Sequence, residues 1–313
     1  MPIYRLEKTD GDLSKAELIV AQETDLQLEE HLESWLENSP GALIPDEIVL
    51  WIGRQTSART EENVVFPDLL GVDADGNLIV AELKRAKTPR DTVAQLLEYA
   101  AWANELTEEQ IHAHAEGYLE KPFQNAFREA FDIPDDEDIP PLNSAMRLFI
   151  AAGEILPSVA AVCRFLRTTY GMDVSCLSVS TFQTEAGEML VGIESTVGDE
   201  TSTPAKKQKR SESPSGRWSR DKPVKEVVRE AAHEFTGGDT EMEFTPKELF
   251  EIIIKKYPEF NRATVLGQIT PGCPNHPSQK HHSGKHKSYW RVGVGKYRLY
   301  DPDRDGADEA EAS

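Results

Sequence analysis

Two carboxylates and a lysine lie where their spacing could support metal-dependent chemistry. Asp68 follows Pro67, and after thirteen intervening residues come Glu82, Leu83 and Lys84. Two adjacent carboxylates repel each other, and a hard divalent cation such as Mg²⁺ or Mn²⁺ relieves that repulsion. A lysine beside the cation could position or deprotonate a water, or neutralise charge on a phosphate under attack. These residue types predict a Mg²⁺ or Mn²⁺ site that acts on phosphate esters.

A β-hairpin is the element that must bring these residues together. Asp75 and Gly76 lie between two apolar segments and form a strong hairpin signal. On the second segment the period of two places Glu82 and Lys84 on the same face of a mainly apolar strand. Burying either charge alone is costly, so each needs a partner. Asp68 lies on the first arm and can approach Glu82 across the ladder.

Composition is typical of a globular cytoplasmic protein. The chain has 313 residues, of which 39% are hydrophobic, and this length suggests two domains. No apolar run approaches the ~18 residues of a membrane span, so we expect no membrane association. The sequence shows no secretory signal. Its three cysteines are odd in number and widely spaced, which fits free thiols in a reducing compartment.

Charge is distributed unevenly along the chain, whose net charge is −21. Residues 1–203 hold 14 Lys and Arg against 38 Asp and Glu, a net charge of −24. Residues 204–300 hold 19 against 11, which gives +8, and residues 301–313 hold one against six, which gives −5. A basic segment within an acidic chain predicts an attached nucleic-acid-binding module. Charge alone is equally compatible with a solvated surface that has no partner.

The domain boundary is expected in a segment rich in Ser, Thr, Pro and charge. We predict a first domain over 1–196, a disordered linker over 197–223, a second domain over 224–302 and a frayed acidic tail over 303–313. The first domain alternates apolar strands with helices, which indicates an α/β fold with a mixed sheet. Expected helices span 25–38, 90–114 and 158–170, and expected strands span 48–55, 146–153 and 174–183.

The second domain has helical patterns over 222–235, 245–257 and 261–269. The second of these helices has a capping box, with Thr245 followed three residues later by Glu248. A hairpin turning at Gly293–Gly295 follows. Three helices followed by a small hairpin predict a winged helix-turn-helix-like domain.

The motif Pro67-Asp68 with Glu82-Leu83-Lys84 resembles the defining elements of the PD-(D/E)XK nuclease superfamily. The core of NucS-like endonucleases is similar in sequence to the segments DLLGVDADGNLIVAELKR and AQLLEYA. It is also similar to the upstream segment EEHLESWLENSP, which leads into WIGRQ. This resemblance covers roughly residues 25–105. It implies a restriction-endonuclease-like mixed sheet flanked by helices, and a Mg²⁺- or Mn²⁺-dependent deoxyribonuclease.

The resemblance also implies roles for individual residues. Asp68, Glu82 and Lys84 are the expected catalytic residues, and Asp68, Glu82 and Leu83 the expected metal ligands. A glutamate on the first helix completes the family site. Glu29 lies at the border of the apolar stripe of that helix, and its spacing to the Ser39-Pro40 end matches that of the family. Glu33 is the alternative. The family glutamine on the next helix corresponds to Gln95, which shares a helical face with Tyr99.

The end of the second domain resembles restriction-associated winged-helix domains, which finish on a similar Gly-Lys-Tyr-Arg-Leu-Tyr. Lys285, Lys287, Arg291 and Lys296 are therefore the expected DNA-binding residues. The cysteine and histidines of 273–286 fit no common structural zinc spacing and offer a single thiolate.

Two functions fit the sequence. The first is a metal-dependent DNA endonuclease whose basic C-terminal domain supplies DNA binding. The alternative is a catalytically inactive nuclease fold that binds DNA or regulates another protein. RNA as the substrate and a homodimer both stay open, as do the recognised sequence and the biological pathway. The intact Asp68, Glu82 and Lys84 favour the enzyme.

Overall fold

The computed structural model describes residues 3–7, 17–24, 29–54, 67–198, 222–279, 282 and 284–311. The strands are β1 Ile3–Glu7, β2 Glu17–Thr24, β3 Leu50–Arg54, β4 Leu69–Val72, β5 Leu78–Lys87, β6 Met146–Glu154, β7 Asp173–Gln183, β8 Met189–Val197, β9 Tyr289–Gly293 and β10 Lys296–Leu299. The helices are α1 Glu29–Asn38, α2 Thr92–Asn104, α3 Glu108–Leu119, α4 Phe123–Phe131, α5 Pro157–Tyr170, α6 Val224–Thr236, α7 Pro246–Lys256, α8 Arg262–Ile269 and α9 Pro302–Glu311. The predicted linker lies mostly at 199–221, outside the described residues.

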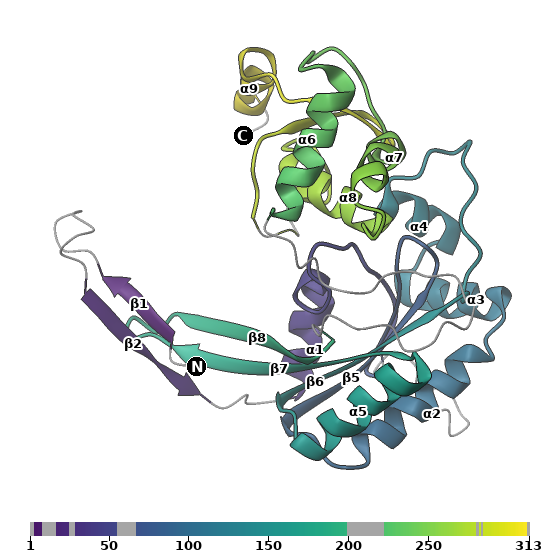
Figure 1. The fold of residues 1–313 in the computed structure, drawn as a ribbon, viewed down its shortest axis with the longest axis vertical. Coiled ribbons are helices and arrows are strands. Elements are labelled where there is room, and N and C mark those ends of the chain that lie inside the picture. Colours follow the sequence, from purple (N-terminus) through teal and green to yellow (C-terminus); the bar gives the residue numbers. More distant parts are fainter. Residues whose placement is uncertain are drawn as a thin grey trace.

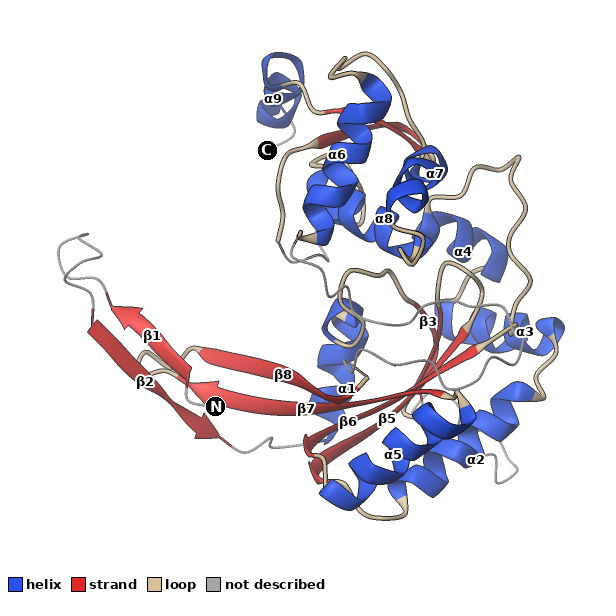
Figure 2. Ribbon diagram, in the orientation of Figure 1, coloured by secondary structure: helices blue, strands red, loops and turns tan. Residues whose placement is uncertain are grey.

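A curled mixed sheet forms the centre of the first part of the chain (Figures 1 and 2). Its strand order is β1-β2-β7-β6-β5-β4-β3, and β8 pairs with β7. β5, β6 and β7 are parallel to one another, whereas the β3–β4, β4–β5, β1–β2, β2–β7 and β7–β8 pairs are antiparallel. The expectation of an α/β fold with a mixed sheet is confirmed.

The two faces of β5 belong to two different hydrophobic clusters, as the period of two predicts. Leu78 and Val80 pack in the larger cluster, together with residues of α2 and α5. Ile79, Ala81 and Leu83 pack in the smaller cluster, which α1 covers. In Figure 1, α2 and α5 lie on one side of the sheet and α1 lies on the other. Both sides of β5 are therefore buried, which fixes the direction of every side chain along it.

The helix expected over 90–114 is wrong as a single element. The structure contains α2 and α3 instead, separated at Glu105 and Leu106. Thr107 caps α3: its hydroxyl accepts from the Gln110 N–H, and the Gln110 side chain accepts from the Thr107 N–H. This capping box satisfies backbone N–H groups at a new helix start, so it favours two helices over one.

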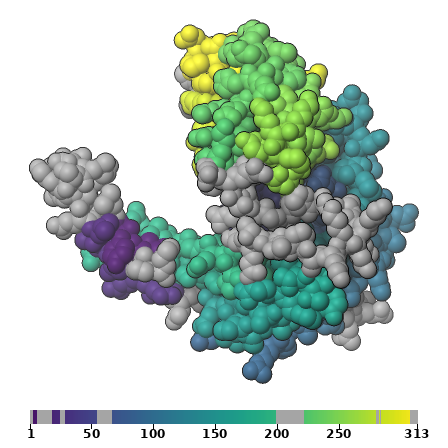
Figure 3. Space-filling model, in the orientation of Figure 1, coloured from purple at the N-terminus to yellow at the C-terminus, as the bar shows by residue number. Residues whose placement is uncertain are grey.

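A long arm, which the sequence pattern does not predict, leaves the body of the sheet. It consists of β1, β2 and the far ends of β7 and β8 (Figure 1). The space-filling view shows the arm projecting away from the rest of the molecule (Figure 3). The C-terminal half of β7 lies between β2 and β8, because β6 pairs with β7 only as far as Ser178.

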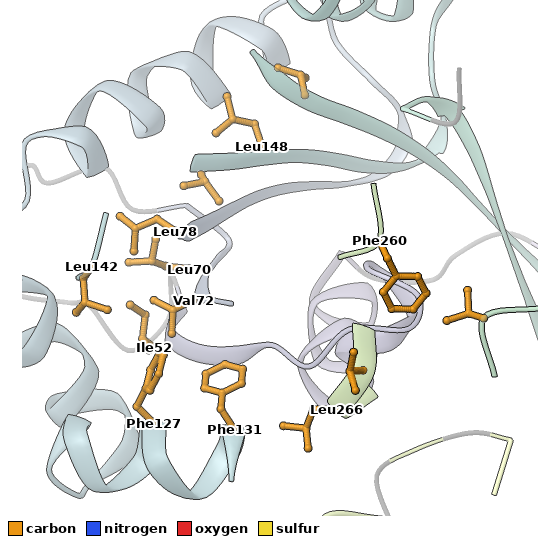
Figure 4. Packing of buried hydrophobic residues seen from close by; sticks show 14 of the residues in the cluster. Ile52, Leu70, Val72, Leu78, Phe127, Phe131, Leu142, Leu148, Phe260 and Leu266 are labelled. Atoms are coloured by element: carbon orange, nitrogen blue, oxygen red, sulfur yellow. The ribbon is translucent and has the colours of Figure 1, made fainter. Parts of the chain in front are cut away.

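The C-terminal part consists of α6, α7 and α8 followed by the β9–β10 hairpin. It shares one continuous hydrophobic cluster with the sheet domain. In Figure 4, Phe127 and Phe131 of α4 lie between Ile52 and Leu266 of α8. An apolar interface of this kind fixes the position of the C-terminal part relative to the sheet domain.

Close backbone contact strengthens this docking. A Cβ added at Gly267 of α8 would lie 2.0 Å from the carbonyl oxygen of Asp46, so only glycine fits there. The neighbouring Gln268 side chain donates to Asp46 Oδ1 at 2.9 Å, and Asn261 donates to Glu47 Oε1 at 3.2 Å.

Asp132, at the end of α4, joins the sheet domain to the β9–β10 hairpin. Its buried carboxylate accepts hydrogen bonds from the Arg291 guanidinium at 2.7 Å, from Gly295 N–H at 2.8 Å and from the Tyr297 hydroxyl. These donors hold the pKa of Asp132 below its usual value although burial opposes the charge. A buried carboxylate with three donors orients the hairpin on α4.

The expectation that the acidic tail is frayed is wrong for its first turns. α9 begins at Pro302, and Asp305 on it is fully buried. The Arg298 guanidinium donates to both Asp305 oxygens, at 2.5 and 2.8 Å, and Asp301 N–H donates to one of them at 2.7 Å. The bidentate pair fixes the start of the tail against β10.

In the described ranges, no helix combines the length and the apolar character needed to cross a membrane.

We predict that Asp132→Ala lowers the free energy of unfolding by about 3–5 kcal/mol, because it leaves the half-buried Arg291 side chain and the buried Tyr297 hydroxyl without their acceptor. Urea denaturation followed by circular dichroism measures the change. Asp136→Ala, in the exposed loop just beyond, serves as the control and changes stability by less than about 0.5 kcal/mol. Equal stabilities of the two variants would show that the hairpin contact does not hold the parts together.

Candidate active site

The site lies just before the start of β4, beside the part of β5 that extends past the β4–β5 ladder. The last paired residues of the β4–β5 ladder are Leu69 and Ala81. The next position along β4 is Asp68, and its register partner is Glu82. Both residues are buried, with 3% and 1% of their surfaces exposed. Asp68 and Glu82 therefore project from the same face of the sheet at neighbouring positions, as the hairpin predicted.

Two carboxylates take the place of the missing strand along the edge of β5. The N–H of Leu83 donates to Asp68 Oδ2 at 2.6 Å, and the N–H of Arg85 donates to Glu29 Oε2 at 2.8 Å. Residues two apart on a strand point their N–H groups to the same edge. Without β4 beside them these groups need acceptors, and Asp68 and Glu29 provide them.

Lys84 lies between the carboxylates. Its Nζ is 2.5 Å from Glu82 Oε1 and 3.7 Å from Glu29 Oε1. Burial opposes the ammonium charge, but the attraction of Glu82, Asp68 and Glu29 outweighs it and raises the pKa of Lys84. The lysine is therefore charged at neutral pH.

The centre has more carboxyl groups than Lys84 can neutralise when all of them are ionised, and this favours the protonated form of Asp68. Burial, and then repulsion from Glu82, raises the pKa of Asp68 to about 8. Burial also raises the pKa of Glu82. The second oxygen of Glu82, Oε2, is buried and accepts no hydrogen bond from an N–H or hydroxyl group of the described residues. A hydrogen bond between the carboxyl groups of Asp68 and Glu82, which requires a proton on one of them, opposes the rise in the pKa of Glu82. A buried carboxylate oxygen without a donor is costly unless a cation binds it.

The donor set fits Mg²⁺ or Mn²⁺. Asp68 and Glu82 offer hard carboxylate oxygens, and the main chain of Leu83 passes between them. Across the described ranges, no three His, Cys, Asp or Glu side chains converge into a metal-binding group. Two carboxylates are sufficient for Mg²⁺, which keeps several of its waters in most protein sites.

The first-helix carboxylates differ in their partners. Glu29 contacts Lys84 and the β5 edge, whereas the buried Glu33 binds the Arg54 guanidinium at 3.1 Å. Glu33 still contributes to the raised pKa of Asp68. Of the two residues that the sequence left open, Glu29 is the one placed against Lys84.

α2 supports the centre from the face that carries Asp68 and Glu82. Tyr99 is buried, and its phenol has a pKa raised to about 12 by burial and by the charges of Glu82 and Asp68. Gln95 lies one turn earlier and is half-buried. Among the described residues, no hydrogen bond to the Gln95 side chain is formed.

The four expected DNA-binding residues of the C-terminal part have different surroundings. Lys285, Lys287 and Lys296 are exposed, and the Lys287 ammonium lies 5.9 Å from the Tyr300 ring centre. Arg291 instead forms the ion pair with Asp132. Its guanidinium is used for domain docking, which a pattern of basic residues in a sequence does not reveal.

The cysteine and histidines of 273–286 have separate partners. Cys273 contacts Asn275 Oδ1 at 3.1 Å, His276 accepts from Ser278 N–H, and His286 contacts Ser288. His281 lies outside the described residues. The described members of this set form no metal-binding group.

A basic segment next to the centre was missed in the sequence analysis. Lys84 is followed by Arg85, Lys87 and Arg90, all three exposed. Four of the fourteen Lys and Arg residues in 1–203 thus fall within seven positions. This clustering of basic residues in an acidic domain is the sequence signal for the segment, and the net charge of the whole domain does not show it.

Residues 223–299 match a family described as a domain of unknown function (DUF7669). No curated protein matches the chain.

Two solved structures are similar to parts of it. A repair endonuclease from Pyrococcus abyssi aligns with 17% identity and a TM-score of 0.27, over 50% of this chain and 49% of that one. The EndoMS–dsDNA2 complex aligns with 16% identity and a TM-score of 0.29, over 56% of this chain and 65% of that one. The chain thus spans about half to two thirds of the length of these proteins.

We predict that the metal-free protein becomes less stable as the pH rises from 5.5 to 8. The pKa of Asp68 is raised in the folded state, so folding favours its protonated form. That contribution is complete below the ordinary pKa near 4 and is lost as the pH approaches about 8. Thermal denaturation in EDTA at both pH values measures the loss.

Mn²⁺ should restore the melting temperature at pH 8, because it binds the ionised carboxylates of the folded state. Asp68→Asn, which retains an acceptor for the Leu83 N–H, should remove both the loss with pH and most of the Mn²⁺ effect. A wild-type melting temperature at pH 8 that does not respond to Mn²⁺ would contradict the metal site.

Proposed function

We propose that this chain is a metal-dependent nuclease that hydrolyses DNA phosphodiester bonds. The observation that carries the proposal is the buried pair of Asp68 and Glu82, in which Glu82 Oε2 has no N–H or hydroxyl donor among the described residues and Glu82 Oε1 lies 2.5 Å from the Lys84 ammonium. Most buried polar atoms in native proteins have a partner, so an unpaired carboxylate oxygen beside a second buried carboxyl group favours a cation site over a purely structural ion pair. The sequence resemblance to PD-(D/E)XK nucleases supports the same function.

Asp68, Glu82 and the main chain of Leu83 are the groups that would hold Mg²⁺ or Mn²⁺. The cation, when bound, supplies Lewis-acid stabilisation of the phosphate and lowers the pKa of a bound water. Asp68 is already held in place by the Leu83 N–H. Glu82 is held through Lys84, so both carboxylates are oriented before a cation arrives.

Lys84 is suited to stabilise negative charge on the phosphate. Its raised pKa keeps the ammonium charged, which disfavours a role as a general base. The contacts with Glu82 and Glu29 hold Nζ over the centre. Glu29 thus positions both Lys84 and the edge of β5. The buried Tyr99 of α2 excludes water from the side of the carboxylate pair that lies away from Glu29.

The phosphate backbone of the substrate would contact two basic regions. Arg85, Lys87 and Arg90 follow directly from the centre, in the domain that otherwise repels nucleic acid. Lys285 and Lys296 lie on the C-terminal part, whose three helices and hairpin support a winged-helix-like DNA-binding domain. Docking of the two parts through Arg291 and Asp132 fixes the relation between these regions.

We predict that the purified chain cleaves DNA only with Mg²⁺ or Mn²⁺, and that Glu82→Gln lowers the cleavage rate at least about 100-fold. The amide keeps the shape of the side chain but removes the charge that binds the cation. Supercoiled plasmid and labelled duplex, single-stranded and RNA oligonucleotides serve as substrates, and EDTA serves as the blank. Glu98→Gln, an exposed glutamate on α2, is the matched control and retains the wild-type rate.

Cleavage by a well-folded Glu82→Gln protein at the wild-type rate would overturn the assignment. A wild-type protein that binds duplex DNA but never cuts it would instead favour the non-catalytic alternative. Glu29→Gln, compared with its exposed neighbour Glu30→Gln, tests the first helix: only the former should slow cleavage.

We also predict that Lys285→Ala, Lys287→Ala and Lys296→Ala each weaken duplex binding and reduce the slope of log affinity against log salt by about 1. Lys121→Ala, a loss of one positive charge at an ion pair with Glu129 on the sheet domain, is the control. Fluorescence anisotropy in Ca²⁺ at two salt concentrations measures the slopes. Unchanged slopes for all three lysines would remove the C-terminal part from the DNA-binding surface.

A further inference from the structure

α8 occupies the position from which a helix-turn-helix would read DNA. Such a motif places its second helix in the major groove. In the C-terminal part, α7 and α8 are the two consecutive helices, and the β9–β10 hairpin follows them. α8, however, faces the sheet domain (Figure 1), and all its residues after Arg262 are buried.

The docking contacts occupy α8 directly. The backbone at Gly267 approaches the Asp46 carbonyl so closely that an added Cβ would lie 2.0 Å from its oxygen, and Gln268 donates to the Asp46 side chain. The exposed Arg262 lies near the sheet domain too: burial raises the pKa of Asp75, and the charge of Arg262 opposes this rise. A duplex therefore cannot receive α8 in its groove while the two parts are docked.

The exposed face of α6 carries two rows of charge. Residues four apart on a helix lie on the same side. Glu226, Glu230 and Glu234 form an acidic row, whereas Lys225 and Arg229 form a second row, which we call the basic row. All five side chains are exposed.

The two rows differ in their partners. In the acidic row, Glu230 Oε2 lies 2.5 Å from Lys222 Nζ, and Glu234 Oε2 lies 2.5 Å from Lys256 Nζ of α7. Neither member of the basic row forms an ion pair with a carboxylate of the described residues. Lysines of this chain thus offset part of the acidic row, and the basic row keeps its charge for another partner.

The segment before β9 is held rigidly against η4, a short 3-10 helix at Thr270–Gly272. His286 N–H donates to the Pro271 carbonyl at 3.0 Å, and Ser288 N–H donates to the Gly272 carbonyl at 2.9 Å. A Cβ added at Gly272 would lie 2.4 Å from the His286 ring, so the imidazole packs directly on this backbone. These contacts fix the direction of the side chains along the segment.

The basic row lies beside this segment. Burial, and then the charges of Lys225 and Arg229, lower the pKa of His286 to about 4, which places both cations close to its ring. Lys285 and Lys287 flank His286 in the sequence, and both are exposed. Four positive side chains from two separate segments therefore gather on one surface of the C-terminal part.

We infer that the basic row of α6, together with Lys285 and Lys287, binds the phosphate backbone of duplex DNA, and that α8 does not contact DNA. The partner rests on the proposed function; the surface is new to it. Cations four residues apart on a helix lie about 6 Å apart along its axis, so each can contact its own phosphate. Over its whole described length α6 has no large apolar side chain exposed, which disfavours a membrane surface as the partner.

The test is binding of a labelled DNA duplex by the full chain, measured by fluorescence anisotropy in Ca²⁺ at two salt concentrations. Lys225→Ala with Arg229→Ala should weaken binding at least about 10-fold and reduce the slope of log affinity against log salt by about 2. Lys247→Ala with Lys255→Ala removes the same charge from exposed positions of α7 and is the matched control. It should bind within about 2-fold of the wild type.

Arg262→Ala separates the two surfaces. This variant should bind like the wild type, whereas a reading helix in the major groove would lose affinity with it. The inference is overturned by a wild type that binds no duplex, by a Lys225→Ala/Arg229→Ala protein that binds as tightly as the control, or by a larger loss for Arg262→Ala.

Cleavage assays on the same proteins keep this inference distinct from the proposed function. A wild type that binds through the basic row but never cuts DNA contradicts the nuclease and supports the surface. Lys225→Arg with Arg229→Lys retains both charges and should restore binding, which a merely structural role for the two side chains would not predict. Circular dichroism confirms the fold of each variant.

Discussion

The interaction on which the site depends is the capture of two unpaired strand N–H groups by carboxylates. β4 begins only at Leu69, opposite Ala81, while β5 continues to Lys87, so the β5 edge beyond Ala81 must find other acceptors. Asp68 and Glu29 supply them. That arrangement holds a second carboxyl group beside Glu82 in a buried position, and Lys84 offsets only part of the charge that the two carry when both are ionised. The excess charge is what a divalent cation would neutralise.

Much of this centre could be predicted from the sequence, because it depends on local rules. The hairpin at Gly76 sets the register, and the register places Asp68 opposite Glu82. The period of two then sets the face on which Glu82 and Lys84 lie. Glu29 could be ranked above Glu33 only through the family resemblance, since its contact with Arg85 bridges residues 56 positions apart in the chain.

The features that could not be predicted depend on contacts between distant segments. Arg291 has the composition of a DNA contact, yet its partner Asp132 lies in another domain. The tail composition indicates fraying, but one buried residue, Asp305, fixes its start against Arg298. The arm was not predicted because its strands have no strong pattern of their own: β2 and β8 gain their register from β7, and β1 gains its register from β2. Tertiary pairing, not local propensity, forms these elements.

The central claim is that Asp68 and Glu82 hold a divalent cation, and anomalous diffraction from a crystal grown with Mn²⁺ tests it most directly. We predict an anomalous peak within about 2.0–2.3 Å of one Asp68 oxygen and of Glu82 Oε2, with waters completing the coordination. The same peak should vanish in a Glu82→Gln crystal. A fully occupied Mn²⁺ elsewhere on the chain, with Glu82 Oε2 still unbound, would contradict the account.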